Sequence, residues 1–192
     1  MNLHLMDTNL MVLIAVAILL VAAIVWLYAA RRKSTTAKLK KRFGPEYDRA
    51  VGIHGAGRKA ELQLEDREKR MEKFKIRELD PKERESFLKQ WESVQSHFVD
   101  SPKGAVTEAD ELISSLMKTR GYPVSEFDQR AADISVDHPR VMENYRSAHE
   151  IALRVGKNEA TTEDLRMAMI YYRSLFEELA QAPATVETKQ VA

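Results

Sequence analysis

Residues 10–30 read LMVLIAVAILLVAAIVWLYAA, a run of 21 residues without a charged side chain. At about 1.5 Å of rise per residue, an α-helix over this run is roughly 31 Å long, which matches the hydrocarbon thickness of a bilayer. Trp26 and Tyr28 lie near its end, where aromatic rings suit the headgroup boundary. The run therefore predicts a single transmembrane helix.

The flanks of this run distinguish a retained anchor from a cleaved signal peptide and predict an orientation. Residues 1–9 contain no Lys or Arg, and the apolar run exceeds the 7–15 residues of a signal-peptide core. Basic residues follow the run at once, and basic flanks stay in the cytoplasm. We therefore expect an uncleaved anchor in the inner membrane, with a short extracytoplasmic N-terminus and a cytosolic body. The basic residues are Arg31, Arg32, Lys33, Lys38, Lys40, Lys41 and Arg42.

The formal net charge of +1 hides a division along the chain. Residues 31–42 carry seven of the 30 Lys and Arg and no acid, which leaves 23 basic against 28 acidic residues in 43–192. A mildly acidic body argues against a nucleic-acid partner, which would require a basic face. Residues 31–42 are placed to contact anionic lipid headgroups, or act only as a determinant of topology.

Composition divides the remainder of the chain into three parts, all of them predicted to be α-helical or disordered. No clean alternation and no Asn-Gly or Asp-Gly turn indicates a strand. After a basic juxtamembrane segment over 31–42, residues 43–79 are dense in charge and predict a solvated spacer helix. Residues 80–180 predict one domain of about five short helices, and residues 181–192 predict a disordered tail. The spacer's sparse apolar residues form one short seam: Ala60, Leu64 and Met71.

Start and stop signals place the helices. Pro45 predicts a helix through Val51. Asp80-Pro81-Lys82-Glu83 supplies an N-cap, a first-turn proline and an acid at the third helical position. Gly121 is placed as a C-terminal cap. Further helix starts are predicted at Ser125 with Asp128, at Asp137 with Pro139, and at Thr161 with Asp164.

Apolar residues recur at three- and four-residue spacing in four of these helices, so each predicts one buried face. An aromatic stripe at this spacing is usually core, so we expect Trp91 to be buried; an exposed patch for a partner helix is the alternative. The four faces are Phe87, Leu88, Trp91, Val94 and Phe98; Ala105, Ala109, Leu112, Ile113, Leu116 and Met117; Val141, Tyr145, Ala148, Ala152 and Val155; and Leu165, Ala168, Met169, Tyr172, Leu175, Phe176 and Leu179.

The best candidates for a site lie between residues 130 and 149. Arg130, Asp133, Asp137 and Arg140 alternate in charge at the junction of two predicted helices. This alternation predicts an ion-pair network that fixes the helix crossing, and a recognition surface for a partner is the alternative. Asp137 and His138 are expected to cap the second helix and to form hydrogen bonds there.

Two histidines and a tyrosine complete this region. His138 and His149 are 11 residues apart, roughly 16 Å along a helix, which is too far for one metal ion. Tyr145 and His149 are four residues apart and are expected to touch, as a possible hydrogen-bonded pair. No motif supplies a nucleophile or cradles a cofactor, so we expect no catalytic residue, cofactor or metal.

Three stretches carry a resemblance to a known group: FGPEYDRA over 43–50, QRAADISVDHP over 129–139 and YRSAH over 145–149. With them the chain resembles a group of small single-pass bacterial membrane proteins of unassigned function. The resemblance implies a bacterial inner-membrane setting. It implies no activity, cofactor or catalytic residue.

Three hypotheses about function remain open. The first is a non-enzymatic, membrane-tethered helical domain that binds or scaffolds another protein at the cytoplasmic face. The second is a lipid-sensing or envelope-stress component that works through residues 31–42. The third is an enzyme or ligand-binding bundle that uses residues 133–149. A deep pocket lined by Asp133, His138, Tyr145 and His149 would favour the third.

Overall fold

The computed structural model describes residues 3–55 and 57–181, which form helices joined by turns and short connections, so the predicted all-α class is confirmed. Contacts divide the chain into two compact units, one ending at Lys41 and one beginning at Arg42. The helices are α1 (Leu3–Phe43), α2 (Pro45–His54), α3 (Arg58–Met71), α4 (Pro81–Asp100), α5 (Pro102–Thr119), α6 (Phe127–Ile134), the 3₁₀ turn η1 (Pro139–Val141), α7 (Met142–Gly156) and α8 (Thr162–Gln181).

Large apolar side chains are exposed along α1 from Leu13 to Tyr28. This stretch is long and apolar enough to cross a membrane, and none of it is buried. Soluble proteins rarely expose a contiguous apolar surface of this size. The helix is therefore a candidate for a single membrane anchor or a signal sequence.

The basic juxtamembrane segment over residues 31–42 continues α1. No Gly or Pro occurs between Ala30 and Phe43, so nothing interrupts the helix. Within it, the Thr35 hydroxyl donates a hydrogen bond to the Arg31 carbonyl oxygen, at 3.2 Å. Gly44 ends the helix because its φ of 49° lies in the left-handed region that glycine tolerates.

The predicted spacer over residues 43–79 is not separate from the bundle, because the second unit begins at Arg42 and contains α2 and α3. α3 packs against α2 and α6. The short seam of Ala60, Leu64 and Met71 is fully buried or nearly so. The burial of this seam was not predicted because α3 is highly charged and its apolar stripe is narrow.

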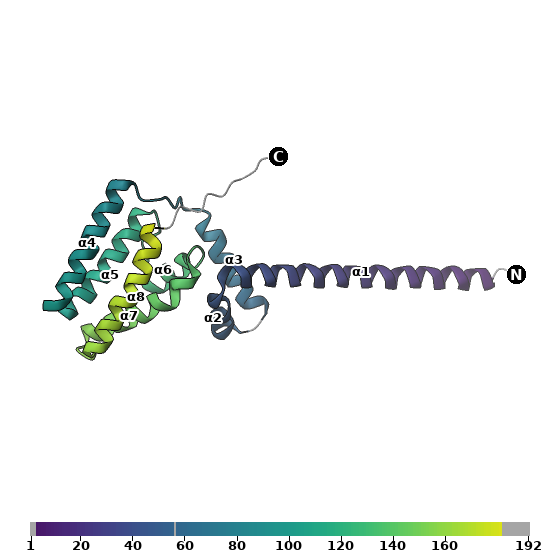
Figure 1. Cartoon of the computed structure of the whole chain (residues 1–192). Helices are drawn as coiled ribbons and strands as arrows, with labels where there is room; N and C mark the ends of the chain where they lie inside the picture. Colours follow the sequence, from purple (N-terminus) through teal and green to yellow (C-terminus); the bar gives the residue numbers. More distant parts are fainter. Residues whose placement is uncertain (1–2, 56, 182–192) are drawn as a thin grey trace. The chain divides into compact units, whose positions relative to one another are not determined.

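Helices α4, α5, α7 and α8 form the bundle (Figure 1), with the strongest contacts between α7 and α8, α4 and α5, and α5 and α8. The predicted capping box is present, since Asp80 accepts from the Glu83 amide and Glu83 accepts from the Asp80 amide. Trp91 is 5% exposed and stacks on Phe176 with ring centroids 4.9 Å apart. Trp91 is therefore a core residue, as predicted.

Two predicted helix starts were wrong in detail. α6 begins at Phe127 after Glu126, with no side-chain cap from Ser125 or Asp128. At the next start, Asp137 accepts a hydrogen bond from the Tyr122 hydroxyl at 3.2 Å instead of capping, and α7 begins only at Met142. The reciprocal bonds of Thr161 and Asp164 do begin α8. Most of the predicted tail, residues 182–192, lies outside the described residues.

Candidate interaction site

Glu46 is the centre of a buried charge cluster that joins α2, α3 and α7. Arg146 of α7 donates from Nη2 to Glu46 Oε2 at 2.8 Å and from Nε to Oε1 at 3.3 Å. Arg67 of α3 donates from Nη1 to Glu46 Oε2 at 3.4 Å. The paired bonds from Arg146 give this contact a fixed geometry as well as charge attraction.

The cluster lies at the edge of the core. The Glu46 side chain is 4% exposed, whereas those of Arg67 and Arg146 are 16% and 15% exposed. Burial lowers the pKa of the Arg67 guanidinium, and the neighbouring Glu46 carboxylate opposes this shift. One carboxylate thus faces two arginines, and the Ser135 hydroxyl is a further acceptor for Arg67 Nη1 at 3.3 Å.

Asp133 of α6 is the centre of a second buried pair beside the first. Its carboxylate is 1% exposed and lies 3.0 Å from Arg70 Nε of α3. Gln129 donates to the same carboxylate at 2.7 Å, one helical turn away. Ser135, which follows α6, accepts from Arg67 and donates to the Ala132 carbonyl oxygen at 2.6 Å. The two clusters therefore lie side by side on α3 and α6, and together their contacts join α2, α3, α6 and α7.

Among the described contacts, the ion-pair network predicted over residues 130–140 is reduced to one pair, that of Asp133, whose partner lies outside this stretch. Asp133 pairs with Arg70, and Arg130 donates from Nη1 to the Ser114 hydroxyl at 3.0 Å. Asp137 accepts from Tyr122, as described above. The predicted partners were wrong because the prediction paired residues that are close in sequence. The groups that are closest in space belong to α3 and α5.

His138 and Arg140 differ in burial. His138 is buried, and its Nδ1 lies 3.0 Å from Glu178 Oε1 of α8. Arg140 is exposed on η1. His138 therefore joins the η1 turn to the end of the bundle.

Tyr145 and His149 contact one aromatic ring. Phe127 stacks on His149 with centroids 3.6 Å apart, and its centroid is 5.0 Å from that of Tyr145. His149 Nδ1 lies 3.6 Å from Asp110 Oδ1, which also accepts from the Tyr172 hydroxyl at 2.8 Å. The predicted hydrogen-bonded pair was wrong, because the Tyr145 hydroxyl is buried without a hydrogen-bond partner among the described groups.

The electrostatics of this second cluster are set by Asp110. Burial raises the pKa of its carboxyl, but the nearby His149 ring and the hydrogen bond from Tyr172 outweigh burial and hold the pKa below its usual value. Burial in turn raises the pKa of the Tyr145 and Tyr172 hydroxyls. Both tyrosines therefore remain neutral, so this cluster carries one carboxylate among aromatic rings.

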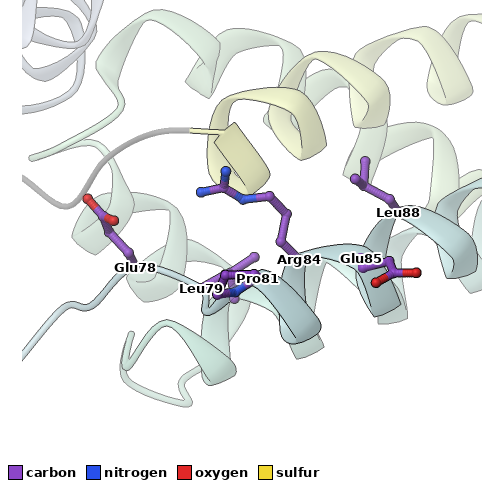
Figure 2. Close-up of a pocket in the computed structure, with 6 residues that line it drawn as sticks. All are labelled: Glu78, Leu79, Pro81, Arg84, Glu85 and Leu88. Atoms are coloured by element: carbon purple, nitrogen blue, oxygen red, sulfur yellow. The ribbon is translucent and has the colours of Figure 1, made fainter.

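The described residues contain no group of three or more His, Asp or Glu side chains placed to hold a metal ion. An open pocket of about 360 Å³ lies elsewhere, where the connection before α4 meets its first turns. Figure 2 shows Arg84 reaching from α4 toward the end of α8 above this pocket. The pocket is lined by Glu78, Leu79, Pro81, Arg84, Glu85 and Leu88, none of which belongs to the predicted site.

The basic residues after the apolar run divide into two groups. Arg31, Lys33, Lys38 and Lys41 are exposed on α1, and Lys40 is exposed but interacts within the chain. Arg42 belongs to the second unit, where its Nε lies 3.1 Å from Glu68 Oε1. The side chain of Arg32 lies outside the described set.

Sequence reasoning missed Glu46, Arg67, Arg70, Arg146 and Asp110, which hold the two clusters together. One signal was present: each stretch that carries the resemblance contributes to the Glu46 network. Residues 43–50 supply Glu46, residues 129–139 supply Asp133 and Ser135, and residues 145–149 supply Arg146. Nothing in their spacing indicated that they meet.

No model of a known protein family matches the chain, and neither a curated protein nor a solved structure matches it.

Proposed function

We propose that this chain is a membrane-tethered interaction module, anchored by α1 in the bacterial inner membrane, with its helical unit in the cytosol. The observation that carries the proposal is the exposed apolar surface of α1 from Leu13 to Tyr28. A bilayer is the environment that removes this surface from water. Basic residues immediately after it favour a cytosolic body.

The orientation is tested with reporters fused after Ala192. A fluorescent protein should fluoresce there, and alkaline phosphatase should be inactive, because this phosphatase needs the oxidising periplasm to form its disulfides. The matched control replaces Arg31, Lys33, Lys38 and Lys41 with glutamine, which should raise the phosphatase signal. Phosphatase activity with no fluorescence in the native chain would refute the cytosolic placement. Release of the body from the membrane would identify α1 as a cleaved signal.

The interaction role is supported by how the candidate chemical groups are used. Asp133 is bonded to Arg70 and Gln129, His138 to Glu178, and Asp137 to Tyr122. Side chains held in this way stabilise helix crossings and are not presented to a substrate. This arrangement favours a binding or scaffolding role over the enzyme hypothesis.

A partner is sought by cross-linking the full chain in membranes, followed by detergent extraction and mass spectrometry. The control is Tyr145→Asp, which places a charge in a fully buried position and should unfold the bundle without affecting α1. We expect one set of proteins to be captured with the native chain and lost with the variant. Equal capture by both chains would assign the contacts to α1 alone and defeat the proposal for the helical unit.

A further inference from the structure

Arg120 fixes the place where the described chain ends. Arg120 is 1% exposed; it donates from Nη1 to the Leu179 carbonyl oxygen at 3.0 Å and from Nε to the Arg77 carbonyl oxygen at 3.2 Å. One guanidinium therefore ties the last turn of α8 to the connection that precedes α4. That connection continues directly into the lining of the open pocket described above. The chain that follows Gln181, the last residue of α8, therefore starts beside this pocket.

The pocket offers an apolar surface and one hydrogen-bond donor that lacks a partner. Leu88 was predicted to be buried but is 41% exposed, because it lies about 100° around α4 from Phe87, at the edge of the apolar face. Arg84, one helical turn before Leu88, has a buried Nε without a hydrogen-bond partner among the described groups. Both side chains point from α4 toward α8 in Figure 2. Buried donors without a partner are costly and rare, so these two residues indicate an occupant.

The lining also limits what the occupant can be. Its two acids already interact within the chain, since Glu85 Oε1 lies 2.7 Å from Lys89 Nζ and Glu78 has a partner too. Arg84 is therefore the group that can receive a further acid. A volume of about 360 Å³ is at the lower end for ligand pockets, which suits a few side chains of a peptide. The pocket thus fits a peptide in which an acidic residue stands beside an aliphatic one.

The segment that follows α8 contains this combination. Residues 182–192 read APATVETKQVA, in which Glu187 is the sole acid and Val186 precedes it. Val186 is five residues beyond Gln181, so it can lie up to about 17 Å from the end of α8. A segment on so short a tether has an effective concentration on the order of millimolar at a neighbouring site. Even a weak contact with the pocket would therefore be populated.

We propose that Val186 and Glu187 occupy this pocket. Val186 packs against Leu79 and Leu88, and the Glu187 carboxylate accepts a hydrogen bond from Arg84 Nε. The inference is independent of the membrane tether, because it concerns the helical unit alone. It also defines a surface for a partner of the same chemistry, since a peptide with an acid beside an aliphatic residue would have to displace residues 186–187 before it bound.

The test uses the absence of cysteine from the chain. The variant E85C/T188C places one thiol in the pocket lining and one next to Glu187, in the full chain in detergent. Oxidation with diamide is followed by non-reducing electrophoresis. The matched control is S86C/T188C, because Ser86 is adjacent on α4 and equally exposed but does not line the pocket. A disulfide requires the two Cα atoms to approach to about 7 Å, so we expect E85C/T188C to form it several times faster.

A second comparison tests the contact with Arg84. Within E85C/T188C, the further change E187Q should slow disulfide formation by about twofold to fivefold, the range of a partly exposed ion pair. K189Q also removes one charge from the segment and should leave the rate unchanged. Equal rates for the two cysteine positions would overturn the proposal, as would equal effects of E187Q and K189Q. Cross-linked dimers in place of the internal disulfide would assign the pocket to a second copy of the chain and refute the internal contact.

Discussion

Replacing Glu46 with glutamine should lower the free energy of unfolding by roughly 2–4 kcal/mol. Removal of one member of a buried ion pair costs about 3–5 kcal/mol, since the other member keeps its charge without its partner. Here the carboxylate is 4% exposed, but Arg67 and Arg146 are 16% and 15% exposed and regain some water. Glutamine also keeps one acceptor oxygen. Both effects place the expected loss below the upper limit.

The assay is urea unfolding of the full chain in detergent, followed by Trp91 fluorescence in a Trp26→Phe background. Glu163→Gln is the matched control, because Glu163 and Arg166 form a closer pair, at 2.6 Å, on the surface. Exposed pairs contribute about 0–1 kcal/mol, so this variant should change little. If Glu46→Gln shifts the unfolding midpoint no more than the control does, the Glu46 network does not stabilise the fold.

Three further outcomes are expected. Trp91→Ala should lower the free energy of unfolding by about 3–5 kcal/mol because the ring is buried in the core; urea unfolding followed by circular dichroism measures this loss, and an unchanged midpoint would place Trp91 on the surface. Gly121→Ala should lower the free energy of unfolding by more than about 1 kcal/mol, since φ is +92° and a Cβ would lie 2.5 Å from a backbone carbonyl oxygen. Gly52→Ala, in open space within α2, should raise the free energy of unfolding by about 0.5–1 kcal/mol. Hydrogen bonds hold the pKa of Glu83 and Asp164 at about 2. The stability that these ionised carboxylates provide is fully present above the unfolded pKa of about 4, and it should be lost as the pH falls from 4 to 2. Thermal unfolding at pH 7, 4 and 2 measures this loss, and a melting temperature that rose towards pH 2 would contradict it.

Helix boundaries with local causes were predictable. The Asp80–Glu83 capping box, the left-handed turn at Gly121 and the apolar face of α5 each depend on residues within about a turn of one another. The same reasoning failed at Asp137, where the hydroxyl of Tyr122, 15 residues away, takes the side chain that a cap would use. Local sequence cannot reveal such a competitor.

The candidate site was predictable only in part. The alternation of charge over residues 130–140 indicated a network of ion pairs, but Asp133 is the residue that forms one, and its partner is Arg70, 63 residues earlier. Arg70 lies on a helix whose composition is typical of a solvated surface. Its narrow apolar stripe indicates a buried face only once α2 and α6 are known to cover it. The pairing of charges across helices is a property of the packing, which periodicity within one helix does not encode.

The pair of Glu46 and Arg146 also sets an order of events during synthesis. These residues are 100 apart in sequence, and ribosomes add about 5–20 residues per second, so the arginine follows the glutamate by roughly 5–20 s. During that interval α2 and α3 have neither α6 nor α7 to pack against. For a chain tethered as proposed, α1 reaches the translocation machinery first. The glutamate is therefore already tethered near the membrane when the arginine is added, and the Glu46–Arg146 pair forms on a chain that is anchored through α1.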